Sequence, residues 1–150
     1  MENFDSQMAA RVWQRVQGDS KKEDLSAALP LFLQKELTEL NRYHQLSITL
    51  GSISKSNIEQ LIKITQQCIS VLRGIHLLLT NTVPQVTPSP LPKELPISVL
   101  RRCYGTSLHQ IAQYEHWGTY PEYGPGFVGL SKLSRQRCLL LLQLLGSVRP

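Results

Sequence analysis

Several side chains that could take part in chemistry interrupt otherwise apolar helical segments of this sequence. The carboxylate of Glu36 stands among the leucines of residues 29–50. Three later apolar segments are interrupted near their middle in the same way, by hydroxyls, a thiol and a guanidinium: Thr65, Cys68, Ser107, Ser134 and Arg137. An unpaired carboxylate in a protein core is costly. Glu36 is therefore expected to have a partner or a chemical purpose.

Nucleophilic or redox chemistry by these groups has little support. A serine or cysteine nucleophile needs a histidine base within reach, and none stands on the apolar stripes. The histidines have no Glu-x-x-His or His-x-x-x-His spacing, so surface or interface positions are expected for them: His44, His76, His109 and His116. Cys68 is the best candidate for a redox thiol, but apolar flanks favour an inert one. The sequence also lacks a Gly-rich phosphate loop.

Apolar residues recur at spacings of three and four in four segments, which is typical of helices with one buried face. The first stripe is Leu29, Leu33, Glu36, Leu40, Tyr43, Ser47 and Leu50. The second is Ile58, Leu61, Thr65, Cys68, Leu72, Ile75 and Leu79. The third is Ile97, Leu100, Tyr104, Ser107, Ile111 and Tyr114, and the fourth is Phe127, Leu130, Ser134, Arg137, Leu141 and Leu144. Together they predict an all-α, antiparallel four-helix bundle with a polar layer through its core.

Residues 1–24 are predicted as an N-terminal helix and loop, and residues 25–150 as the bundle, within one domain. The helix Ser6–Gln17 is expected to pack on the bundle through Trp13 and Val16. Gly18 should end this helix, residues 19–26 are predicted as a loop, and Pro30 is placed in the first turn of the next helix.

A proline-rich segment separates the second and third helices. Residues 82–96 contain Pro84, Pro88, Pro90, Pro92 and Pro96. An extended path of ~3.1 Å per residue spans ~45 Å, longer than the ~30 Å of a 20-residue helix. The segment is therefore expected to cross the whole bundle and to start the third helix parallel to the second. The alternative is a disordered linker between two independent hairpins.

The composition of the chain restricts its expected cellular location and the kinds of partner it can bind. The three cysteines, Cys68, Cys103 and Cys138, have no CxxC spacing, so reduced core residues are expected. No apolar run of membrane-spanning length and no signal peptide is found, and a cytoplasmic location is expected. The net charge is +5, but the basic residues do not form the continuous patch that nucleic acid requires. If nucleic acid did bind, its binding would depend steeply on salt.

The residues 36–43, Glu-Leu-Thr-Glu-Leu-Asn-Arg-Tyr, resemble the first helix of rubrerythrin-like members of the ferritin-like superfamily. In that helix a metal-ligating Glu is followed seven residues later by Tyr. Other segments similar to such bacterial ferritin-like domains are 72–80, 112–114, 121–125 and 144–146. The resemblance covers the chain after Asp24 and implies a ferritin-like bundle with one long crossover. In the family, iron or manganese is held by one Glu on each of the first and third helices and by Glu-x-x-His on the second and fourth.

This sequence departs from that ligand pattern at every position but Glu36. The other metal-site positions hold Thr65, Cys68, Ser107, Ser134 and Arg137, with Tyr43 and Tyr114 adjacent to the layer. Arg137 would repel metal cations. The expectation is therefore a non-catalytic binding or structural module without a cofactor. The alternative is a metal-binding oxidoreductase or iron-handling protein with an altered iron or manganese site around Glu36 and Cys68.

Two further expectations follow from these positions. Glu36 and Arg137 should form an ion pair inside the bundle, with hydroxyls donating to the carboxylate: Thr65, Ser107 and Ser134. The expected partners are an unidentified protein or a second copy of the chain. A homodimer interface would use an apolar strip that includes Phe32, Ile48 and Ile69.

Overall fold

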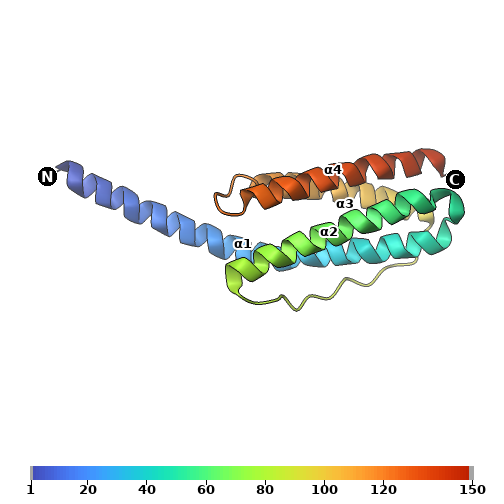
Figure 1. The fold of residues 1–150 in the computed structure, drawn as a ribbon, viewed down its shortest axis with the longest axis horizontal. Coiled ribbons are helices and arrows are strands. Elements are labelled where there is room, and N and C mark those ends of the chain that lie inside the picture. Colours follow the sequence, from blue (N-terminus) through green and yellow to red (C-terminus); the bar gives the residue numbers. More distant parts are fainter. Residues whose placement is uncertain (1, 149–150) are drawn as a thin grey trace.

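The computed structural model describes the backbone of residues 2–148 and the side chains of residues 8–9, 21–52 and 54–148. Its regular elements are α1 (Glu2–Thr49), the short 3-10 helix η1 (Ser52–Ser54), α2 (Lys55–Thr80), α3 (Pro96–Trp117) and α4 (Gly124–Ser147). Figure 1 shows the four α-helices packed side by side. The predicted all-α four-helix bundle is confirmed, and residues 2–148 contain no strand.

The helix α1 is much longer than the sequence pattern predicts. It continues through Gly18 and through residues 19–26, and Pro30 lies in its interior. The predicted helix end and loop are therefore wrong. A single Gly costs only about 1 kcal/mol in a helix, and residues 21–28 are mostly good helix formers. The N-terminal part of α1 extends beyond the bundle in Figure 1. The side chains of Trp13 and Val16 lie outside the described residues, so their packing stays a prediction.

The proline-rich segment runs along the outside of the bundle and crosses it from end to end, and this crossing is the predicted one. Figure 1 shows that α2 ends at one end of the bundle and that α3 begins at the other, with residues 81–95 between them. The segment contacts the bundle at two points at least. The side chain of Val86 packs against the apolar core, and the Ser89 N–H donates to Thr38 Oγ1 over 2.9 Å. As a result α3 runs in the same direction as α2.

The connection between α3 and α4 is tight and depends on two glycines. The Gly124 N–H donates to the Tyr120 carbonyl over 2.8 Å. A Cβ atom on Gly124 would lie 2.5 Å from the Gly118 carbonyl oxygen, so no other residue fits without moving the backbone. The connection therefore ends at residue 123, and Pro125 lies in the first turn of α4.

The core consists of two apolar clusters, one on each side of a polar layer. One cluster includes Leu29, Leu33, Leu72, Phe127 and Leu130, and the other includes Leu46, Ile58, Leu100, Leu141 and Leu144. The predicted stripes of α2 and α4 are buried almost throughout. The stripe of α3 is rotated, because Val99, Cys103 and Gln110 are buried whereas Ile97, Tyr104 and Ile111 are only partly buried. In the first predicted stripe, Ser47 is exposed and Leu40 and Leu50 are partly buried, which also corrects that prediction.

The predicted dimer strip does not exist as a surface. Phe32 and Ile69 are buried in the chain's own core, whereas Ile48 is 83% exposed. The three cysteines are free and buried, as predicted. Among the described residues, no helix is long and apolar enough to span a membrane.

Candidate functional site: a buried ion pair and an adjacent pocket

An ion pair between Glu36 of α1 and Arg137 of α4 occupies the polar layer. Both side chains are completely buried. The guanidinium binds the carboxylate through two nitrogens: Nη1 donates to Oε2 over 2.5 Å, and Nη2 donates to Oε1 over 2.9 Å. Two parallel hydrogen bonds of this kind add both energy and geometric specificity to the ion pair. The structure thus contains the ion pair that the sequence predicts.

Two side chains of α3 complete the coordination of the carboxylate. The Tyr114 hydroxyl donates to Glu36 Oε1 over 2.7 Å, and Gln110 Nε2 donates to the same oxygen over 3.0 Å. Gln110 Oε1 also accepts from Arg137 Nη2 over 3.2 Å. Gln110 therefore bridges both members of the ion pair. Tyr43, which was expected beside the layer, is buried, but its hydroxyl has no partner among the described residues.

The three predicted hydroxyls lie in the layer, but two of them bind Arg137 instead of Glu36. Ser134 Oγ accepts from Arg137 Nη2 over 2.8 Å, and Thr65 Oγ1 accepts from Nη1 over 3.3 Å. Thr65 also donates to the Leu61 carbonyl over 2.8 Å, so its proton is already used within α2. Ser107 is buried, and its hydroxyl has no partner in the described part of the chain. The expectation that these hydroxyls donate to Glu36 is therefore wrong.

Burial and the charge of Glu36 shift the pKa values of three groups in the layer, Arg137, Tyr114 and Cys68. Burial lowers the pKa of Arg137, but the Glu36 carboxylate more than offsets this, and the guanidinium pKa rises well above its ordinary value. Burial, and next the charge of Glu36, raise the pKa of the Tyr114 hydroxyl well above its usual range. The same two causes raise the pKa of the Cys68 thiol to about 12. Cys68 is therefore a neutral thiol at physiological pH, not a reactive thiolate.

This set of donors does not fit a di-metal centre. Among the described residues, Glu36 is the only carboxylate in the layer, and its oxygens already accept bonds from a guanidinium, a phenol and an amide. The described residues contain no group of three or more His, Cys, Asp or Glu side chains that could hold a metal ion. His44, His109 and His116 are exposed. His76, expected at the surface, is instead buried at the end of α2, where Nδ1 lies 2.9 Å from the Thr82 carbonyl.

Comparisons of this chain with protein-family models, curated proteins and solved structures find no match. The family resemblance therefore rests on the residues of the chain itself.

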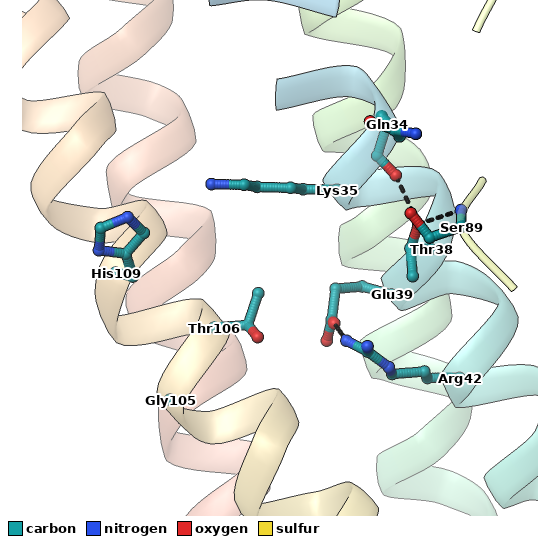
Figure 2. A pocket seen from close by; sticks show the side chains of 9 residues that line it. All are labelled: Gln34, Lys35, Thr38, Glu39, Arg42, Ser89, Gly105, Thr106 and His109. Carbon is teal, nitrogen blue, oxygen red and sulfur yellow. Dashed lines mark hydrogen bonds and ion pairs between the residues drawn. The ribbon is translucent and has the colours of Figure 1, made fainter. Parts of the chain in front are cut away.

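A second buried carboxylate, Glu39, lies one turn from the layer beside a pocket. One of its oxygens forms an ion pair with Arg42, and the other has no hydrogen-bond partner among the described residues. Burial raises the pKa of Glu39, whereas Arg42 lowers it. Figure 2 shows this carboxylate directed from α1 toward Thr106 of α3, on the wall of a pocket of about 500 Å³.

Gln110 and Glu39 were missed by the sequence interpretation, although signals for both exist. Gln110 stands three residues after Ser107 and four before Tyr114, so it belongs to the same helical face. Glu39 lies three residues after Glu36, on the side of α1 that faces α3. Its partner Arg42 follows at i+3, a spacing that allows an ion pair on a helix.

The two buried tyrosines allow a matched test of the layer. We expect Tyr114→Phe to lower the free energy of unfolding by about 1.5–3 kcal/mol, because Glu36 loses a bond to its charged group. Tyr43→Phe should be close to neutral, since its hydroxyl has no partner among the described residues. Urea unfolding of both variants measures the difference. Equal losses would mean that Tyr114 contributes only its packing.

Proposed function

We propose that this chain is a ferritin-like bundle in which an ion pair has replaced the di-metal centre, and that it acts as a non-catalytic binding or structural module. The Arg137 guanidinium carries the proposal: it lies completely buried among the side chains at the family's metal-site positions and pairs with Glu36. A fixed cation at that place opposes metal binding. The pair instead links α1 to α4, with α2 and α3 attached through Thr65 and Gln110.

The ferritin-like assignment is supported by the connectivity. Two helix pairs, α1 with α2 and α3 with α4, are joined by one long crossover that traverses the bundle (Figure 1). That order is typical of ferritin-like folds rather than of simple up-down-up-down bundles. The side chains at the family's ligand positions also lie in the middle of the core, between the two apolar clusters.

The alternative, an oxidoreductase with an altered site at Glu36 and Cys68, has less support. Both oxygens of the carboxylate already accept hydrogen bonds from its three partners, and burial raises the pKa of the Cys68 thiol to about 12. A metal ion there would have to displace Arg137 into the apolar core.

Metal analysis tests the proposal. Protein purified without chelator should contain iron and manganese far below one ion per chain, because the only carboxylate of the layer is paired with Arg137. Inductively coupled plasma spectrometry measures this content. Near-stoichiometric metal would overturn the proposal.

A variant with the family's ligand set provides a positive control. It combines five substitutions: Thr65→Glu, Cys68→His, Ser107→Glu, Ser134→Glu and Arg137→His. If the ferritin-like correspondence is right, this variant should bind two metal ions per chain while its helix content stays unchanged by circular dichroism. A helical variant that binds no metal would contradict the ferritin-like assignment without affecting the ion pair itself.

A further inference from the structure

Two adjoining pockets form a groove between α1 and α3. The first has a volume of about 500 Å³ and is lined by polar side chains that include Lys35, Glu39, Arg42, Thr106 and His109. The second has a volume of about 560 Å³, and its lining includes Leu31, Phe32, Ala112 and Trp117. Lys35 lines both pockets. Volumes of this size are typical of small-molecule sites.

Glu39, on the wall of the polar pocket, has one carboxylate oxygen without a hydrogen-bond partner among the described residues. Glu39 is fully buried, and only one of its oxygens is paired with Arg42. The neighbouring Cys103 thiol stays protonated, because burial and then Glu39 raise its pKa, and a thiol is only a weak donor. An unsatisfied buried carboxylate oxygen costs free energy. A ligand that brings a strong donor would recover that free energy.

The charged side chains around this pocket favour a ligand that carries both a positively and a negatively charged group. Lys35 extends from α1 toward α3 in Figure 2, and no hydrogen bond or ion pair from it occurs within the described residues. A simple anion would suit Lys35 but would meet the Glu39 carboxylate. A simple cation would suit Glu39 but would meet Lys35 and Arg42. Glu39 and Lys35 are four residues apart on one helix, about one turn or ~5.4 Å, so one small zwitterion can reach both.

The second pocket adds an apolar and aromatic requirement. Phe32 of α1 and Trp117 of α3 both line it. Gln113 also lines this pocket, and its Oε1 is buried without a partner among the described residues. A flat apolar side chain with one N–H donor would match both the aromatic lining and this acceptor.

We infer that the α1/α3 groove binds a free α-amino acid with a large aromatic side chain. The ammonium group donates to Glu39, the carboxylate lies against Lys35 and His109, and the side chain enters the pocket between Phe32 and Trp117. This inference names a ligand for the binding module proposed above and so rests on that proposal. The metal analysis tests the metal-free core separately, so the two can fail independently.

Isothermal titration calorimetry with L-tryptophan tests the inference on the intact protein. Three analogues each remove one recognition element: N-acetyl-L-tryptophan lacks the ammonium, tryptamine lacks the carboxylate, and glycine lacks the side chain. Saturable binding of L-tryptophan, with each analogue at least about tenfold weaker, is the expected result. No saturation at about 10 mM L-tryptophan would overturn the inference. Equal binding of any analogue would also overturn it, as would binding of inorganic phosphate alone.

Variants of the protein check the location of the site. Lys35→Met and Glu39→Gln should each weaken L-tryptophan binding at least about tenfold. Gly105→Val should block the polar pocket, because a Cβ atom there meets nothing within 4 Å and extends into the opening. Lys63→Met on α2 is the matched control and should bind normally, since Lys63 lines neither pocket. Unchanged binding by Lys35→Met together with Gly105→Val would overturn the placement even if Glu39→Gln failed to fold.

Discussion

Replacing Arg137 by Met should lower the free energy of unfolding by about 3–5 kcal/mol, because Glu36 would remain buried without its counter-charge. The loss should exceed the packing effect of the substitution, since Met retains most of the aliphatic length of Arg. Urea unfolding followed by circular dichroism measures it. A loss below about 1 kcal/mol would mean that the carboxylate is hydrated or protonated without Arg137.

Arg135→Met is the matched control for this measurement. Arg135 lies two residues away on α4 and pairs with Glu115 of α3, but its side chain is 61% exposed. Exposed ion pairs contribute about 0–1 kcal/mol, so this variant should unfold almost like the unmodified protein. Comparable losses for the two variants would assign the effect to α4 in general and not to the buried pair.

Deleting half of the crossover should abolish the native fold. The end of α2 and the start of α3 lie at opposite ends of the bundle, and residues 81–95 join them (Figure 1). Seven or eight extended residues reach only ~25 Å, whereas the 26 residues of α2 span ~39 Å. Loss of cooperative thermal unfolding is the expected readout.

A variant of unchanged length separates the effect of the crossover's length from the effect of its proline content. Replacing residues 87–93 by Gly and Ser keeps the span but removes the stiffness of the prolines. This control should fold, with a modest loss of stability because its unfolded chain has more conformational freedom. A folded and stable half-length variant would show that α3 does not need to start at the far end of the bundle.

The buried pair could be predicted from the sequence because its members stand at the middle of two clear stripes. On α4 every predicted stripe position is buried, and Arg137 is among them. A charged residue at such a position must find an opposite charge, and Glu36 is the only carboxylate at the predicted polar level. The residue types at these two positions and the helical period of the stripes were together sufficient to predict the ion pair.

The partners on α3 were harder to predict, because that helix carries two overlapping apolar patterns. Ile97, Tyr104 and Ile111 define one face, and Val99, Cys103 and Gln110 define another. The choice between them depends on how α3 rotates against α1 and α4, which no local pattern specifies. The burial of Gln110 follows from that rotation and from its two bonds within the layer.

The length of α1 escaped prediction for a different reason. Gly18 and Pro30 are helix breakers by local preference, yet both lie inside this helix. Gly costs about 1 kcal/mol and Pro about 3 kcal/mol inside a helix. The many neighbouring residues with favourable helix propensity offset these costs. The groove between α1 and α3 could not be predicted either, because it results from the placement of two helices and from no motif in either.

The coupling free energy between Glu36 and Arg137 tests the central claim most directly. It is obtained from the unfolding free energies of the unmodified protein, Glu36→Leu, Arg137→Met and the double variant. Each single variant leaves one buried charge unpaired, whereas the double variant leaves none. The ion-pair core predicts that the double variant loses about 2–3 kcal/mol less than the sum of the two single losses. Losses that add within about 0.5 kcal/mol would contradict it, because the two side chains would then not meet in the folded protein.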